Sequence, residues 1–316
     1  MTIDDVARQG EAILSRIEQV IVGKHEALSL ILGAVLAGGH VLLEDYPGLA
    51  KTLAARCFSS TLGLTFSRIQ FTPDLLPADI VGTHLYRRGE GRFEFRPGPI
   101  FAQLILADEI NRATPKTQSA LLEAMQEGQA TIEGDTRPLP EPFVVLATQN
   151  PIEFEGTFPL PEAQVDRFLV RVRFGYPTVA EEAEILRRRI ERRTEEISLQ
   201  AVTDADEVLR MRQTLEEVFV DPDLLEYMVR IVGQTRSHGS LAVGASPRGA
   251  LALLKLSRAR AALDGRDYVL PDDVKAVAVP ALAHRLILSP ELWTHDVRAE
   301  DIVVDILRDT PVPKVG

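Results

Sequence analysis

Five short apolar runs, separated by longer segments of helical or turn-rich composition, constrain the fold of this 316-residue chain most strongly. Strands that are apolar along their whole length and joined by helical crossovers are typical of a parallel sheet buried on both faces. We therefore predict an α/β domain whose five-stranded parallel sheet is formed by residues 41–43, 66–71, 104–106, 143–146 and 168–172.

The pattern changes near Tyr176-Pro177 to longer helical periods that continue to residue 316. Residues that favour helix starts recur in this half of the chain, at Thr178, Asp204, Asp221-Pro222, Ser246-Pro247 and Pro271. We predict an α/β domain over residues 1–176 and a smaller, all-α domain over residues 177–316.

Two segments inside the α/β region read as β-hairpins that the five-stranded sheet does not need. In residues 84–96, apolar and polar side chains alternate around Phe93 and Phe95, and the segment turns at Gly89-Glu90-Gly91. The second segment, residues 130–139, turns at Gly134-Asp135. Both hairpins are expected to be insertions that present a surface.

Charge and cysteine content narrow the functional classes. The 35 basic and 46 acidic residues give a net charge of −11, which argues against non-specific attraction to nucleic acid or an anionic membrane. The single cysteine, Cys57, cannot form an internal disulfide, and no secretion signal is visible, so we expect a cytoplasmic protein. The uncharged stretch 27–43 is interrupted by glycines, which favours a buried helix and strand over stable membrane insertion.

The first apolar run leads into a loop that ends in Lys51-Thr52 at a predicted helix start. This layout is typical of a P-loop, in which backbone N–H groups surround phosphates, the lysine reaches them and the threonine hydroxyl binds Mg²⁺. Asp45 and Ala50 stand where the strict pattern has glycines. The loop alone therefore fits phosphate binding and an ordinary strand–turn–helix junction equally well.

Adjacent carboxylates, Asp108 and Glu109, follow the third apolar run. The carboxyl end of a buried parallel strand is where ligands of open α/β sheets bind, although such a pair could also simply begin a helix. Together with Lys51-Thr52, the pair favours an ATPase in which Asp108 helps to hold Mg²⁺ and Glu109 activates water. Asn150 follows the fourth run and could contact the γ-phosphate or that water, or form a turn with Pro151.

Taken in order, the motifs resemble those of the MoxR family of AAA+ ATPases, in the helix-2-insert clade, over nearly the whole chain. They are Val22-Gly23-Lys24, residues 42–52 as Walker A, 104–109 as Walker B, Asn111-Arg112, residues 147–151 as sensor 1, 161–168 around Asp166-Arg167-Phe168, and 245–248 as sensor 2. The resemblance implies an AAA+ core, with the two hairpins as the inserts near a central pore, followed by a helical lid.

The resemblance also implies that the chain binds ATP and Mg²⁺. Mg²⁺ would be held by Thr52 and Asp108. Nucleotide contacts would come from Val22, Gly23, Asp45, Tyr46, Pro47, Gly48, Leu49, Ala50, Lys51, Thr52 and Leu53.

Catalytic roles would fall to Glu109, Asn150, Arg167 and Arg248. Arg167 matches the arginine finger that reaches the nucleotide of a neighbouring subunit, which requires a ring, expected to be a homo-hexamer. Arg248 matches the sensor 2 arginine of the lid. Each arginine could instead be structural: Arg167 could pair with Asp166 or Glu162, and the segment around Arg248 could be a plain helix start.

The function implied is ATP-driven, chaperone-like remodelling or maturation of partner proteins, including proteins with von Willebrand factor A domains and client complexes. A magnesium-chelatase-like subunit is a close variant. Two alternatives are a nucleic-acid motor, which shares the inserts, and a nucleotide-binding scaffold without hydrolysis, suggested by Asp45 and Ala50. The net negative charge of the chain argues against the nucleic-acid motor. The presence of Lys51, Glu109 and Arg167 argues against a scaffold that binds nucleotide without hydrolysis.

Overall fold

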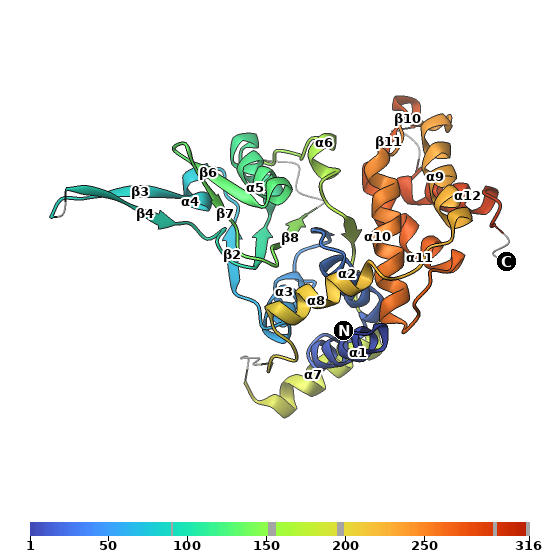
Figure 1. The fold of residues 1–316 in the computed structure, drawn as a ribbon, viewed down its shortest axis with the longest axis horizontal. Coiled ribbons are helices and arrows are strands. Elements are labelled where there is room, and N and C mark those ends of the chain that lie inside the picture. The colour runs from blue at the N-terminus through green and yellow to red at the C-terminus, as the bar shows by residue number, and fades with distance from the viewer. Residues whose placement is uncertain (90, 151–155, 195–198, 293–295, 314–316) are drawn as a thin grey trace.

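A computed structural model describes residues 1–89, 91–150, 156–194, 199–292 and 296–313. Glu90 of the first predicted hairpin and Pro151 of the predicted sensor 1 segment lie outside these ranges. Figure 1 shows a central α/β region with two hairpins on its left and a group of helices on its right. Within the described residues, no helix combines the length and apolar character needed to span a bilayer.

The central sheet confirms the predicted five parallel strands. Their order across the sheet is β2-β5-β8-β1-β9. The strand before the Lys51 loop, β1, therefore lies between β8 and β9, the last two strands of this sheet along the chain. All four neighbouring pairs are parallel. The bounds are β1 Val41–Glu44, β2 Phe66–Gln70, β5 Leu104–Asp108, β8 Val144–Gln149 and β9 Val170–Val172.

Alternate side chains of the central strands enter two different hydrophobic clusters. Val41 and Leu43 belong to one cluster, and Leu42, between them, belongs to the other. In β5, Leu106 and Ile105 are divided in the same way. Because successive side chains of a strand point to opposite faces, a strand covered on both sides must be apolar throughout, which is the pattern seen in the sequence.

Helices cover both faces of the sheet. One face shares a hydrophobic cluster with α1, α2 and α3, and the other shares one with α4, α5 and the second hairpin. The stretch 27–43 is a buried helix followed by β1, as predicted. The bounds are α1 Ile3–Glu18, α2 His25–Leu36, α3 Lys51–Thr61, α4 Pro77–Val81, the 3-10 helix η1 Ile110–Arg112, α5 Pro115–Glu127 and α6 Glu162–Val165.

Both predicted hairpins are present. The first, β3 (Gly82–Arg87) with β4 (Arg92–Pro97), projects far from the body of the molecule (Figure 1). The second is β6 (Gln129–Ile132) with β7 (Asp135–Pro138). Their bases are in contact, since the Arg137 guanidinium lies 4.1 Å from the centre of the Phe95 ring.

The second half of the chain is predominantly helical, and helices α7 to α11 begin where the sequence predicts, whereas the start of α12 was not predicted. Thr178, Asp204, Asp221 and Ser246 each accept a hydrogen bond from a backbone N–H in the first turn that follows. The bounds are α7 Val179–Arg192, α8 Ala205–Leu215, α9 Pro222–Ser237, α10 Pro247–Leu263, α11 Pro271–Leu282, α12 Ala299–Asp309 and the 3-10 helices η2 Ala283–Arg285 and η3 Pro290–Leu292.

A short antiparallel pair of strands is an addition to the predicted all-α second half. It joins β10 (Leu241–Val243) to β11 (Ile287–Leu288). Two or three residues are too few for an alternating pattern to stand out in the sequence.

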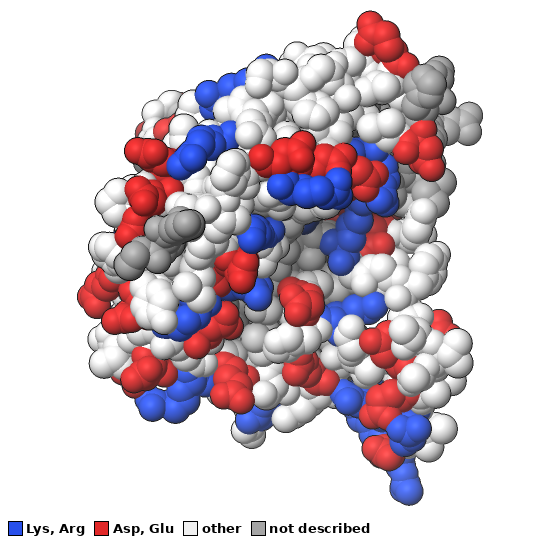
Figure 2. All heavy atoms as spheres, turned by 90° about the vertical axis from the view of Figure 1, so that its right-hand side faces the viewer, with Lys and Arg blue, Asp and Glu red and all other residues white. Residues whose placement is uncertain are grey.

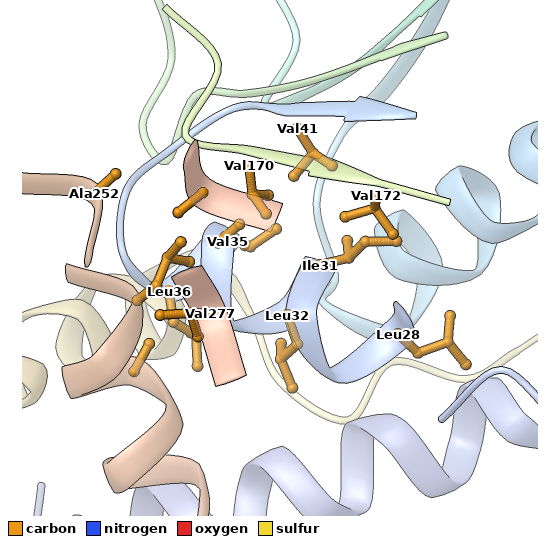
Figure 3. Close-up of a cluster of buried hydrophobic side chains, with 14 of the residues drawn as sticks. Leu28, Ile31, Leu32, Val35, Leu36, Val41, Val170, Val172, Ala252 and Val277 are labelled. Atoms are coloured by element: carbon orange, nitrogen blue, oxygen red, sulfur yellow. The ribbon is translucent and has the colours of Figure 1, made fainter. Parts of the chain in front are cut away.

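The second half packs onto the sheet through a shared hydrophobic cluster. Val35 of α2 lies between Val170 of β9 and Val277 of α11, and Ile31 of α2 lies beside Val172 of β9 (Figure 3). The same cluster continues into α8, α9 and α10. The second half therefore shares a hydrophobic cluster with one face of the sheet, while the cluster on the other face belongs to the first half alone.

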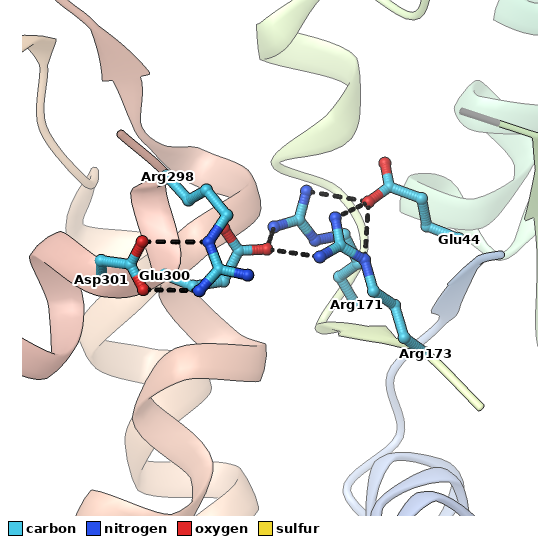
Figure 4. Close-up of polar contacts among 6 residues, drawn as sticks. All are labelled: Glu44, Arg171, Arg173, Arg298, Glu300 and Asp301. Atoms are coloured by element: carbon cyan, nitrogen blue, oxygen red, sulfur yellow. Dashed lines mark hydrogen bonds and ion pairs between the residues drawn. The ribbon is translucent and has the colours of Figure 1, made fainter. Parts of the chain in front are cut away.

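An ion-pair network adds a polar link between the halves (Figure 4). Glu44, the last residue of β1, pairs with Arg171 at 3.2 Å and also with Arg173. Glu300 of α12 pairs with the same two arginines, at 2.7 and 2.9 Å. The final helix is thus connected to the residue that enters the Lys51 loop.

His40, directly before β1, is buried in its neutral form. Its Nδ1 accepts the backbone N–H of Val145 at 3.0 Å, and its Nε2 lies 3.0 Å from the Met125 carbonyl oxygen. A ring that accepts at one nitrogen and donates at the other carries one proton. Burial lowers the pKa of His40 from 6.5 to about 4.

We expect the free energy of unfolding to fall as the pH is lowered from 6.5 to 4. The folded-state pKa of His40 lies below its unfolded value, so unfolding takes up a proton in this range, at a cost of about 1.4 kcal/mol per pH unit. Denaturant unfolding at several pH values should show a shallower pH dependence in His40→Gln than in the wild-type protein. An unchanged dependence in His40→Gln would contradict this assignment.

Candidate nucleotide-binding and catalytic site

The loop between β1 and α3 has two residues with a positive φ, although it holds a single glycine. Gly48 has φ of +83°. Ala50, at the N-cap of α3, also has a left-handed backbone, with φ of +57° and ψ of +15°. This conformation explains why the strict pattern prefers glycine there. The loop then delivers Lys51 and Thr52 to the first turn of α3.

A cavity of about 370 Å³ lies beside this loop and brings together most of the predicted site. The carboxyl ends of β5 and β8 form the wall opposite the N-terminus of α3. The lining residues are Pro47, Gly48, Leu49, Ala50, Lys51, Thr52, Leu53, Asp108, Glu109, Thr148 and Asn150. Residues from three separate segments thus meet at one edge of the sheet.

Lys51 is half-buried and folded against its own loop. Its Nζ donates to the carbonyl oxygens of Asp45 and, at 3.1 Å, Tyr46. Burial lowers the pKa of Lys51, while the nearby carboxylates, Asp45 and Asp108 foremost, oppose that shift. The ammonium group therefore lies among negative groups at the edge of the cavity.

Thr148 connects the two predicted acidic residues. Its Oγ1 donates to Asp108 at 2.6 Å and accepts the backbone N–H of Glu109 at 2.8 Å. Glu109 has a left-handed backbone, with φ of +56° and ψ of +50°, which directs the chain sharply out of β5. The bond to Thr148 holds this turn, so the carboxyl ends of β5 and β8 are fixed relative to each other.

Two residues of β2 contact the same carboxylates. Arg68 pairs with Asp108 at 2.6 Å, and Gln70 Nε2 donates to Glu109 Oε2 at 3.0 Å. Arg112 also approaches Glu109 Oε2, at 3.3 Å. Arg68, Gln70 and Thr148 are not among the site residues predicted from the sequence.

One signal could have identified the β2 pair. Arg68 and Gln70 are long polar residues at alternate positions between Phe66 and Phe71, so they share a face of the strand. Their relevance depends on β2 lying beside β5, where Gln70 is in register with Asp108. That neighbour relation belongs to the sheet order, which the sequence does not state.

A second, mainly apolar cavity of about 200 Å³ adjoins the first and shares the loop residues Gly48, Leu49, Ala50 and Leu53 with it. Val22, predicted to contact the nucleotide, lines this cavity. Gly23 lies next to the Glu181 side chain and is not among the described lining residues. The remaining walls come from Val20, Ile21, Lys24, Phe174, Gly175, Pro177 and Ile185.

Asp45 and Tyr46 are not among the described residues that line either cavity. The Asp45 carboxylate accepts the backbone N–H groups of Phe174 at 2.5 Å and Gly175 at 2.9 Å. The Tyr46 ring stacks on Tyr176 at 5.7 Å. Both residues attach the loop to the connection that follows β9.

Arg167 and Arg248 are likewise absent from the described lining of the two cavities. Arg167 Nη1 donates to the Leu122 carbonyl oxygen at 2.5 Å. Arg248 Nη1 lies 3.8 Å from the carboxylate of Asp166, the residue that precedes Arg167 in the chain. The structure brings these two arginines to one region, separate from the loop of their own chain.

Cys57 is buried in α3, and burial raises the pKa of its thiol to about 11. Cys57 is therefore a small, buried residue of the core and not a reactive thiolate.

Comparison with known proteins follows the same division of the chain. Residues 40–170 match the ATPase family associated with various cellular activities (AAA), and residues 233–306 match the AAA lid domain. A crystal structure of a protein from Cytophaga hutchinsonii superposes with a TM-score of 0.92 at 40% identity, covering 99% of this chain and 97% of that one.

Two relatives extend over nearly the full length. The uncharacterized protein YeaC of Bacillus subtilis is 48% identical, with 96% of this chain and 94% of the relative covered. Chaperone MoxR1 of Mycobacterium tuberculosis is 43% identical, with 97% and 83% covered. The sheet order, the cavity at the Lys51 loop and these similarities together place the chain in the MoxR family of AAA+ ATPases.

Proposed function

We propose that this chain hydrolyses ATP with Mg²⁺ as part of a ring and uses the energy to remodel or mature partner proteins. One observation carries the proposal: Lys51, Thr52, Asp108, Glu109 and Asn150 line a single cavity. These residues supply a phosphate-binding cation, metal ligands, a general base and a polar amide at one place.

The donor set fits a nucleotide with its metal ion. The N–H groups at the start of α3 and the Lys51 ammonium suit phosphate oxygens, and the apolar second cavity suits a base. Thr52 and Asp108 would hold Mg²⁺ together with phosphate and water oxygens. When bound, Mg²⁺ neutralises charge on the phosphates. Within the described residues no group of three or more His, Cys, Asp or Glu side chains could hold a metal ion, so the phosphates would complete its coordination.

Glu109 is the proposed general base. Gln70 and Arg112 both approach its Oε2, which fixes the direction of the carboxylate at the cavity wall. From there it would accept a proton from the attacking water. Asn150, which is buried at the same wall, would position that water or the γ-phosphate.

We expect Glu109→Gln to bind ATP normally but to lose turnover by about a hundredfold or more, because the amide cannot accept the proton. Lys51→Ala should instead weaken ATP binding itself by about tenfold or more, since it removes the phosphate-facing charge. Equilibrium binding of a fluorescent ATP analogue and steady-state phosphate release separate the two effects. Wild-type turnover in Glu109→Gln would refute the assigned base.

Ring formation is proposed from the position of Arg167. This residue lies outside the described lining of its own chain's cavities, as expected of a group that serves the nucleotide of a neighbouring copy. Arg248 keeps the proposed role of the sensor 2 arginine, which would contact the nucleotide from the lid. An arginine supplied in trans stabilises the charge of the phosphoryl-transfer transition state and makes hydrolysis depend on assembly. A homo-hexamer is the proposed form.

Arg167→Ala should lose turnover by at least about a hundredfold while keeping its ATP affinity. Mixed with an equal amount of Lys51→Ala, it should recover about a quarter of the wild-type rate, because one interface in four then pairs an intact cavity with an intact arginine. Arg308→Ala, a variant of an exposed arginine on α12, is the matched control and should keep full activity. Absence of recovery in the mixture would refute action in trans.

The partner and setting are proposed by analogy. A relative is named chaperone MoxR1, and the family resemblance adds von Willebrand factor A domain proteins and client complexes as partners. The two family matches fall on either side of the proposed boundary between the core, residues 1–176, and the lid, residues 177–316. A single, buried cysteine suits the reducing cytoplasm.

A nucleic-acid motor is the second candidate, because Arg87, Arg88, Arg92 and Arg96 are exposed on the first hairpin. Arg87 is already paired with Glu94, however. On the face shown in Figure 2, basic side chains are interspersed with acidic ones instead of forming a continuous basic path. The charge balance therefore favours the protein remodeller.

We expect the ATPase rate to stay unchanged when single- or double-stranded DNA is added at low ionic strength. The acidic chain has little electrostatic attraction for the phosphate backbone. Stimulation by DNA that disappears when the arginines of the first hairpin are replaced would favour the motor instead.

A further inference from the structure

Asp166 is the point where the lid contacts the segment that carries Arg167. Its carboxylate accepts a hydrogen bond from Ser246 Oγ at 3.1 Å and pairs with Arg285, and Arg248 lies 3.8 Å away. All three partners belong to the second half of the chain. A single acidic side chain therefore joins α10 and η2 to the residue directly before Arg167.

Arg285 makes the most extensive of these contacts. Its side chain is 3% exposed, and its Nε is bound to the lid through the Ala281 carbonyl oxygen at 2.8 Å. The Nη1 and Nη2 groups donate across the boundary to the carbonyl oxygens of Asp166 and Phe168, both at 2.7 Å. The guanidinium thus holds the backbone on both sides of Arg167.

The neighbouring lid residue strengthens the same contact. His284 Nε2 lies 3.1 Å from the carbonyl oxygen of Phe168, which Arg285 also contacts. Burial lowers the pKa of His284 well below its ordinary value, so the ring is neutral. The lid therefore contributes two adjacent donors to one short segment of the core.

A buried, charged donor cannot lose these acceptors without a large desolvation penalty. When the lid shifts, the backbone at Arg167 must move with η2 or the buried bonds of Arg285 must break. Movement of the backbone at Arg167 is favoured over breaking of the bonds. Because η2 follows α11 directly in the chain, Arg285 moves with the lid and takes its bonded partners with it. The position of the lid and the position of Arg167 are therefore coupled.

We propose that Arg285, acting through Asp166, is a positioning residue that makes the placement of Arg167 follow the lid. The inference rests on the proposed function of Arg167 in trans. It adds a route of regulation: a lid movement in one subunit changes hydrolysis in the neighbouring subunit that receives its Arg167. Arg285 itself is not among the described residues that line either cavity.

Arg285→Lys tests the proposal in the full-length chain. Lysine keeps the charge beside Asp166 but cannot reach the same set of carbonyl oxygens. We expect ATP affinity within twofold of wild type and a loss of turnover of about tenfold or more. An equal mixture with Lys51→Ala should exceed the activity of either variant alone, because the defect lies in the arginine that is donated and not in the variant's own cavity.

Arg266→Lys is the matched control. Arg266 is a partly buried lid arginine that binds Asp273 within the lid, with two bonds of 2.7 Å, and does not contact the Arg167 segment. Its replacement should leave turnover within twofold of wild type. A loss of turnover equal to that of Arg285→Lys would overturn the proposal, because general loosening of the lid would then suffice.

Complementation separates this inference from the proposed function. If the Arg167→Ala mixture recovers activity and the Arg285→Lys mixture does not, Arg285 acts within its own subunit and the inference is wrong. If the Arg167→Ala mixture fails as well, action in trans is wrong and the inference falls with it. If Arg285→Lys lowers the melting temperature strongly, Asp166→Asn replaces it in the equal mixture with Lys51→Ala. The inference then predicts that this mixture recovers ATPase activity, and absence of recovery would contradict it.

Discussion

Burial of β1, β5 and β8 between two apolar layers is the constraint on which the site depends. Strands covered on both faces can present polar groups only at their ends, and parallel strands end at the same edge of the sheet. Glu44 is in register with Gln149, and Gln70 with Asp108. The packing of the core therefore sets the spacing of the Lys51 loop and the acidic pair before any specific polar contact forms.

Two non-glycine residues in left-handed conformations lie at this edge, Ala50 and Glu109. Such conformations cost about 1–2 kcal/mol each and persist where the surrounding structure determines them. Ala50 is fixed between β1 and the first turn of α3, and Glu109 by the bond of its N–H to Thr148. The strain is thus placed at the phosphate-facing loop and at the proposed base, where direction matters most.

The second half of the chain is tied to this site by more than its linker. It shares the hydrophobic cluster of α2 and β9, it reaches the end of β1 through Glu300, and it holds the segment before β9 through Arg285. Apolar packing holds the two halves together but is not directional, whereas these buried and half-buried polar contacts fix the relative orientation of the halves. Any change in the angle between the halves must therefore involve Glu44 or Asp166.

The sequence by itself determined the five strands of the central sheet, the two hairpins, the starts of α7 to α11 and the choice of Lys51, Asp108 and Glu109 as candidate site residues, because each depends on residues adjacent in the chain. Hydrophobic periodicity and helix capping depend on neighbouring residues, so they can be recognised in the sequence without knowledge of the fold. Only the tertiary structure decided the strand order, the contacts of Gln70, Thr148 and Arg285, and the turning of Asp45 away from the cavity. These features join segments distant in sequence, and contact energies between such segments depend on packing that no local pattern records.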